Sequence, residues 1–209
     1  MAETEFERSI NLELRERFEL DRNEKNLSCY FMSEIVFFED FYSGISLVEN
    51  NLDLLTSPNL IFIATELSSN WMPEESKWIS LLCKQMNTYS DMEKSVAYYL
   101  ISEHFSRDSL EFLRNLKMSV KYVGDNKFVR NRLKLAELIC DKETALRLAE
   151  EAMSSFVSVN DNETLKTKPT SFWLDEERWI NEYILGIDVS DVIFQRDIKR
   201  IENVKKRFA

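Results

Sequence analysis

Residues 90–156 decide the fold, and they read SDMEKSVAYYLISEHFSRDSLEFLRNLKMSVKYVGDNKFVRNRLKLAELICDKETALRLAEEAMSSF. Apolar residues recur in this stretch at intervals of three and four, which is the spacing of one helix face. The stretch opens on Ser90 and Glu93, the two residues of a capping box that satisfies free backbone N–H groups at a helix start. We therefore expect consecutive amphipathic helices.

Polar caps divide this stretch into four helices. The second helix begins near Asp108. The third and fourth helices are capped by Asp125 and Asp141. Gly124 occupies the position after the second helix where a left-handed residue closes a helix. The loops between them contain only a few residues, so neighbouring helices must run roughly antiparallel. The predicted architecture is a compact multi-helix bundle or a short α-solenoid of antiparallel helical hairpins.

The rest of the chain gives the same helical signals, and about ten helices are expected in all. The further helices are predicted at 4–22, 27–42, 45–55, 57–69, from 73 onward, at 172–185 and at 191–207. Ser43 and Gly44 are expected to end the second of these, and a strand over residues 35–38 is the competing interpretation.

Composition supports an all-α fold in one domain spanning residues 1–209. The chain has 209 residues but only 3 glycines and 3 prolines, whereas a β-rich protein of this length needs more turn residues. The polar segment 158–170 contains Asn160 and Pro169 and is the expected seam within that domain.

Location and redox chemistry follow from simple absences in the sequence. No apolar run approaches the roughly 20 residues of a membrane span, and the acidic N-terminus lacks the basic start of a signal peptide. We therefore expect a cytoplasmic protein.

Cys29, Cys83 and Cys140 lie far apart and are odd in number, so we expect small buried side chains rather than a disulfide framework.

Motifs for metal, nucleotide or acid–base chemistry are missing. The only histidine, His104, is adjacent to Glu103 rather than at metal-ligand spacing, and we interpret it as a residue at the edge of the helical core. The three glycines stand alone, so no phosphate-binding loop is present. Paired carboxylates such as Glu150 and Glu151 are typical of solvated helix faces. We predict a non-catalytic protein without metal or cofactor.

Charge is unevenly distributed along the chain. The net charge is −10, residues 1–113 carry 21 acidic and 9 basic side chains, and residues 114–134 carry seven basic side chains and one acid. This basic strip either pairs with the acidic half of the chain or binds a peptide or an anionic ligand. The candidate anion-binding residues are Arg114, Lys117, Lys121, Lys127 and Arg130. Nucleic acid is disfavoured, because no stacking aromatic residues are interleaved on the same helix face.

The favoured functional hypothesis is an inhibitor or immunity protein, of the antitoxin type, that neutralises a basic toxin or effector domain. Acidity concentrated in one half of a small protein favours a cationic partner. Acids beside aromatic residues are the expected contacts. They are Glu39, Asp40, Glu74, Glu75, Asp175, Glu176, Glu177 and Trp179. The alternatives are a helical scaffold or adaptor that uses the 114–134 strip, and a helical enzyme with an unmarked site.

Overall fold

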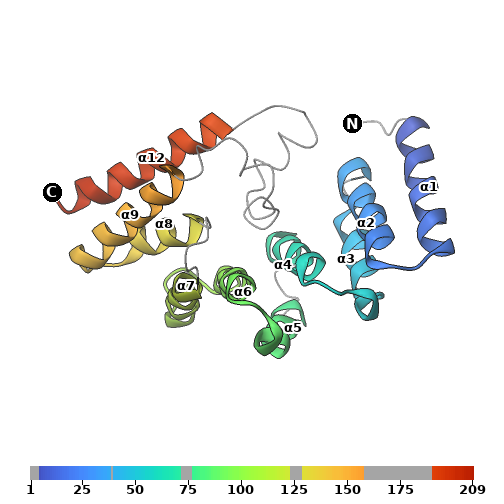
Figure 1. Ribbon diagram of the computed structural model, residues 1–209, viewed down its shortest axis with the longest axis horizontal. Helices are drawn as coiled ribbons and strands as arrows, with labels where there is room; N and C mark the ends of the chain where they lie inside the picture. Colours follow the sequence, from blue (N-terminus) through green and yellow to red (C-terminus); the bar gives the residue numbers. More distant parts are fainter. Residues whose placement is uncertain (1–4, 39, 72–76, 123–128, 158–189) are drawn as a thin grey trace. The chain divides into compact units, whose positions relative to one another are not determined.

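Helices make up nearly all of the structure, a computed structural model that describes residues 5–38, 40–71, 77–122, 129–157 and 190–209 (Figure 1). These ranges contain ten α-helices and two short 3-10 helices and no strand, which confirms the all-α prediction. The elements are α1 (Glu5–Leu20), α2 (Glu24–Phe38), α3 (Phe41–Glu49), η1 (Leu52–Leu54), α4 (Asn59–Trp71), α5 (Lys77–Gln85), η2 (Met86–Thr88), α6 (Asp91–Glu103), α7 (Leu110–Tyr122), α8 (Val129–Leu138), α9 (Lys142–Val157) and α12 (Ser190–Arg207).

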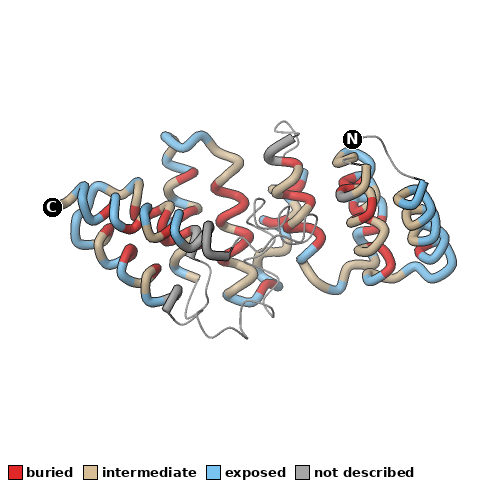
Figure 2. Tube along the Cα trace, turned by 90° about the horizontal axis from the view of Figure 1, so that it is seen from above, coloured by how far each residue is buried: buried red, intermediate tan, exposed pale blue. Residues whose placement is uncertain are grey.

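The helices fall into two compact units, Met1–Leu82 and Cys83–Ala209. In the first unit α1 to α4 pack in chain order, each on the next; in the second α6 to α9 do the same, and α12 lies on α8 and α9. The predicted seam at 158–170 lies outside the described residues, and the single domain stays a prediction. Figure 2 shows buried positions alternating with exposed ones along the helices, as amphipathic elements require.

Helices α1 and α2 form an antiparallel pair in the first unit. The Asn11 amide donates to Ser33 Oγ at 2.9 Å, and the rings of Phe18 and Tyr30 lie 6.3 Å apart between centroids. Phe18 is buried, whereas Phe6 at the start of α1 is 73% exposed. The apolar stripe of α1 is therefore covered only toward its C-terminal end.

Gly44 does not end a helix, contrary to the sequence prediction. Helix α2 stops at Phe38, and Asp40 caps α3 by accepting hydrogen bonds from the backbone N–H and the hydroxyl of Ser43, at 2.9 and 2.7 Å. Gly44 lies inside α3 and is buried. The strand alternative for residues 35–38 is wrong as well, because these residues belong to α2.

The packing of α3 on α2 explains the position of this glycine. A Cβ atom at Gly44 would lie only 2.6 Å from Ile35 Cδ1 and 3.3 Å from Phe31 Cε2. The absent side chain thus lets the two helices approach closely. A tertiary contact, rather than a chain reversal, requires glycine here.

Two local caps that the sequence predicted in the second unit are present, whereas the predicted caps at Gly124 and Asp125 lie outside the described residues. Ser90 and Glu93 form the full capping box of α6, and the Asp141 carboxylate accepts from Thr144 N at 2.8 Å at the start of α9. His104 is the C-cap residue of α6 and is partly exposed, with its ring 5.8 Å from that of Phe105. The placement of His104 agrees with a residue at the core edge.

The cysteines differ from the expectation of burial. Cys29 is half-buried, but Cys83 and Cys140 are exposed, and all three thiols are free. Exposure follows from their places near helix ends, because Cys83 lies close to the end of α5 and Cys140 follows α8.

None of the described helices combines the length and the apolar character that crossing a bilayer requires.

Glu24 ties the start of α2 to the loop that precedes α4. Its carboxylate accepts hydrogen bonds from the backbone N–H groups of Thr56 and Ser57, at 2.9 and 3.3 Å, and from both hydroxyls. Burial alone would raise the pKa of Glu24, but these four hydrogen bonds outweigh it and lower the pKa. The charged form is therefore the one that holds the loop.

We expect Glu24→Gln to make the first unit less stable at neutral pH, by an amount that shrinks in acid. Because the pKa of Glu24 is lower in the folded state, the stability it contributes is present above its ordinary pKa of 4.5 and is lost as the pH falls through the folded value. Urea unfolding of both proteins between neutral pH and strongly acidic pH measures this difference. Glu16→Gln, at an exposed glutamate of α1, is the matched control. A Glu24→Gln effect that is constant with pH would contradict the assignment.

Candidate functional site

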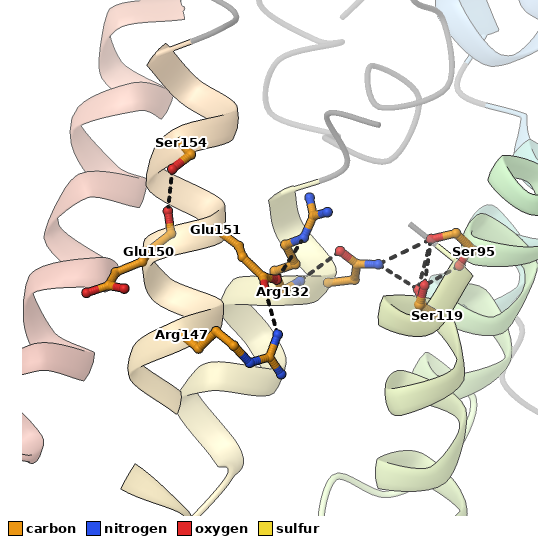
Figure 3. Close-up of polar contacts among 8 residues, drawn as sticks. Ser95, Ser119, Arg132, Arg147, Glu150, Glu151 and Ser154 are labelled. Atoms are coloured by element: carbon orange, nitrogen blue, oxygen red, sulfur yellow. Dashed lines mark hydrogen bonds and ion pairs between the residues drawn. The ribbon is translucent and has the colours of Figure 1, made fainter. Parts of the chain in front are cut away.

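A buried polar network fixes the register of α6 against α7. Ser95 Oγ donates to the Ser119 carbonyl at 2.9 Å, and Ser119 Oγ donates to the Ser95 carbonyl at 2.6 Å (Figure 3). The Asn131 amide of α8 adds bonds to Ser119 Oγ at 2.9 Å and to Ser95 Oγ at 3.3 Å. All three side chains are fully buried. A shift of one helix along the other would leave these groups unpaired, so the network holds a single register.

Two tyrosines stack on each other next to this network. The rings of Tyr98 and Tyr122 are 5.7 Å apart between centroids and nearly parallel, at 3°. Tyr98 lies one turn after Ser95, and Tyr122 lies one turn after Ser119. Helical side chains lean toward the N-terminus of their own helix, so in an antiparallel pair both rings lean back toward the serines and meet.

Cations surround the stacked rings. Lys94 Nζ lies 5.5 Å and Lys121 Nζ 5.7 Å from the ring centroid of Tyr122. Burial raises the pKa of Tyr98, Tyr122 and Cys83 raise it further, and Arg114 is close enough to lower it. The Tyr98 hydroxyl thus stays protonated at neutral pH, as a hydrogen-bond donor beside positive charges.

We call this surface the cationic tyrosine face. It consists of Lys94, Tyr98, Arg114, Lys117, Lys121 and Tyr122, in which the α7 cations are exposed and the tyrosines are partly exposed. Among the described residues, Lys94 Nζ pairs with the Asp91 carboxylate at 3.6 Å. The face therefore presents mainly donors and positive charge to solvent, around a planar aromatic pair, which suits a ligand with oxyanion groups.

The predicted basic strip divides into an exposed part and an internal part. Within the described residues no carboxylate pairs with Arg114, Lys117 or Lys121 of α7, and pairing of these cations with the acidic half stays a prediction. On α8, by contrast, Lys134 pairs with Glu103, and Arg132 Nε lies 3.7 Å from Glu151. Two residues of the predicted set are not placed: Lys127 lies outside the described residues, and the Arg130 side chain is not described.

Of the predicted partner-binding acids, only Asp40 falls in the described part of the chain. Hydrogen bonds from the backbone N–H and then the hydroxyl of Ser43 lower its pKa, so Asp40 is held in its capping role. The remaining residues lie outside the described ranges: Glu39, Glu74, Glu75, Asp175, Glu176, Glu177 and Trp179. This set stays a prediction.

The polar side chains of α8 were missed as an internal cluster by the sequence analysis. Asn131 joins α6 and α7. Arg132 reaches Glu151 of α9 (Figure 3). The Lys134 ammonium lies 5.3 Å from the ring centroid of Tyr99 and 5.6 Å from that of Phe112. One sign of this cluster was present in the sequence. On the short helix α8, the polar residues Asn131, Arg132 and Lys134 are interspersed with the apolar residues Leu133 and Ala136.

Other surfaces offer less defined chemistry. A depression of about 670 Å³ in the first unit is open to solvent, and it mixes both signs of charge. It is lined by Arg22, Asn23, Glu24, Lys25, Asp53, Leu54 and Thr56. The described residues contain no group of three His, Cys, Asp or Glu side chains arranged to hold a metal ion. The cationic tyrosine face is thus the best-defined candidate site.

Comparison of the chain with protein-family models, with curated proteins and with solved structures found no match.

We expect Asn131→Ala to lower the free energy of unfolding by about 1–3 kcal/mol, because it removes a buried amide that bonds two serines. Asn87→Ala, the same change at an exposed position, should stay within about 0.5 kcal/mol of the parent protein. Urea unfolding measures both. Combining Asn131→Ala with Ser119→Ala should give less than the sum of the single effects, since the residues share one network. Additive effects would contradict a shared hydrogen-bond network.

Proposed function

We propose that this protein is a non-catalytic interaction module that binds an anionic partner on the cationic tyrosine face. The observation that carries the proposal is the row of Arg114, Lys117 and Lys121, exposed on α7 without a paired carboxylate in the described residues and adjacent to the Tyr98–Tyr122 stack. Like charges along one helix repel one another, so such a row is destabilising unless a partner neutralises it.

The surrounding charge strengthens this interpretation. On a chain of net charge −10, a local positive surface creates a steep field that orients an approaching anion toward one place. Electrostatic complementarity of this kind increases the association rate and selects among partners.

The chemistry of the face favours binding over catalysis. Lysine, arginine and tyrosine hydroxyl groups are donors that hold oxyanions, and general base catalysis needs an acceptor within reach of a nucleophile. The Asp91 carboxylate is largely exposed and pairs with Lys94, which leaves it poorly placed for proton transfer.

A second candidate function is the acidic inhibitor of a basic toxin or effector domain. Its support is the excess of acids over residues 1–113 together with exposed acids on α1, among them Glu5 and Glu16. Other acids of α1 are partly neutralised, since Glu13 pairs with Arg17 and Glu19 with Arg15. An acidic surface of this kind would act by steering a cationic partner.

Charge reversal separates the two candidates. We expect Arg114→Glu and Lys121→Glu each to weaken partner binding by about 1–3 kcal/mol, as loss of a true interface contact does. Lys199→Glu, at an exposed lysine of α12, makes the same charge change elsewhere in the second unit and should have almost no effect. Affinity capture from the native host, quantified by titration of the captured partner, provides the measurement. Loss of binding in Glu5→Lys/Glu16→Lys alone would favour the inhibitor, and retention by every variant would contradict both candidates.

A further inference from the structure

We infer that the anionic partner is a single-stranded nucleic acid, with a base stacked on the Tyr98–Tyr122 pair and phosphates held by Lys94, Lys121 and Arg114. This inference rests on the proposed function and specifies its ligand. The ligand carries both a planar ring and repeated negative charge, because the face provides a stacked aromatic pair for the ring and lysines for the charge.

The aromatic pair supplies a stacking platform. Proteins that bind single strands without strong sequence preference place aromatic rings beside a positive groove, since every base has a π-face. Tyr98 and Tyr122 are already parallel at 3°, and both remain partly exposed. A base that continues this stack meets a ring surface already in position.

The lysines near the rings supply the charge. The ammonium groups of Lys94 and Lys121 lie within 5.7 Å of the Tyr122 ring centroid. Both chains are long and flexible, so each ammonium can leave the ring to contact a phosphate while a base takes its place. Arg114 and Lys121 are seven residues apart on α7, which is about 10 Å along the helix, or roughly three 3.4 Å steps of a stacked strand.

Other anions use only part of this surface. An acidic peptide satisfies the cations but provides no base to extend the stack. A duplex keeps its bases stacked on one another inside the helix, so their faces are not free for the tyrosines. The acidic excess of the first unit disfavours binding of a polyanion there.

The aromatic residues that the sequence analysis did not find on the basic strip are supplied partly by the neighbouring helix. Tyr122 lies at the end of α7, but Tyr98 comes from α6 and reaches the strip only through the register that Ser95 and Ser119 fix. A single helix of the strip lacks interleaved stacking aromatics, whereas the pair α6 and α7 provides them.

The test uses the full chain and three fluorescent probes in anisotropy titrations. The probes are an oligothymidylate of about 12 nucleotides, which lies within the site sizes of single-strand binding folds, an abasic phosphodiester chain of equal length, and a polyglutamate peptide of equal charge. We expect the oligothymidylate to bind about tenfold or more tighter than the abasic chain, because a stacked base is lost.

Two further readouts locate the interaction. Lys121→Glu should reduce the slope of log affinity against log salt by about 0.7, the contribution of one phosphate contact, whereas Lys199→Glu should not. The exposed Cys83 lies close enough to Tyr98 to raise its pKa, so bound oligonucleotide should slow alkylation of Cys83 but leave that of the exposed Cys140 unchanged. Tyr98→Leu/Tyr122→Leu should bind the base-containing and abasic chains equally, with circular dichroism confirming that it is folded.

Each contrary outcome has a distinct meaning. Equal affinity of the parent protein for the oligothymidylate and the abasic chain, or tighter binding of polyglutamate, would overturn the nucleic acid inference and leave the proposed anion-binding function standing. Absence of any probe binding that responds to Lys121→Glu would overturn the nucleic acid inference and count against the proposed function as well.

Discussion

The hydrogen bonds between Asn131, Ser95 and Ser119 are the constraint on which the second unit depends. Three helices meet at these fully buried side chains, and each polar group there is satisfied only in one arrangement. Apolar packing alone tolerates small slips between helices, whereas a slip here would leave buried donors and acceptors unpaired at a cost of about 1–3 kcal/mol for each group. The network therefore fixes how the helices are aligned along one another, in addition to holding them together.

Helix α8 carries this specificity outward in two further directions. Its Lys134 pairs with Glu103 of α6, and its Glu137 binds Arg200 of α12 through two hydrogen bonds at 2.7 and 3.0 Å. The Arg207 guanidinium of α12 donates to the carbonyls of residues 136, 137 and 139, which are among the last acceptors of α8 and the residue after it. A helix of only ten residues is marginal by itself, so these contacts from its neighbours stabilise it.

Local signals in the sequence predicted several helix caps correctly but did not predict the contacts between helices. The capping box at Ser90 and the cap at Asp141 depend on residues three positions apart, and both are present. Gly44 was misinterpreted as a helix end because its role is set by Ile35, a residue on another helix. The tyrosine stack escaped prediction for the same reason: its two members belong to different helices, and only the buried serines show how those helices align.

Under the proposed function, the same alignment explains how the cationic tyrosine face of an acidic protein can serve as a defined binding site. A ligand that orders side chains on binding loses part of its affinity to their lost freedom, about 0.5–1.5 kcal/mol for each long side chain. The Tyr98–Tyr122 pair is already stacked next to the buried hydrogen bonds between Ser95 and Ser119, so only the flexible cations remain to be ordered. In the proposed complex, the rigid rings determine where a planar group can sit, and the lysines and Arg114 determine which charge can accompany it. Buried polar bonds that contribute modestly to stability thus fix the geometry that recognition requires.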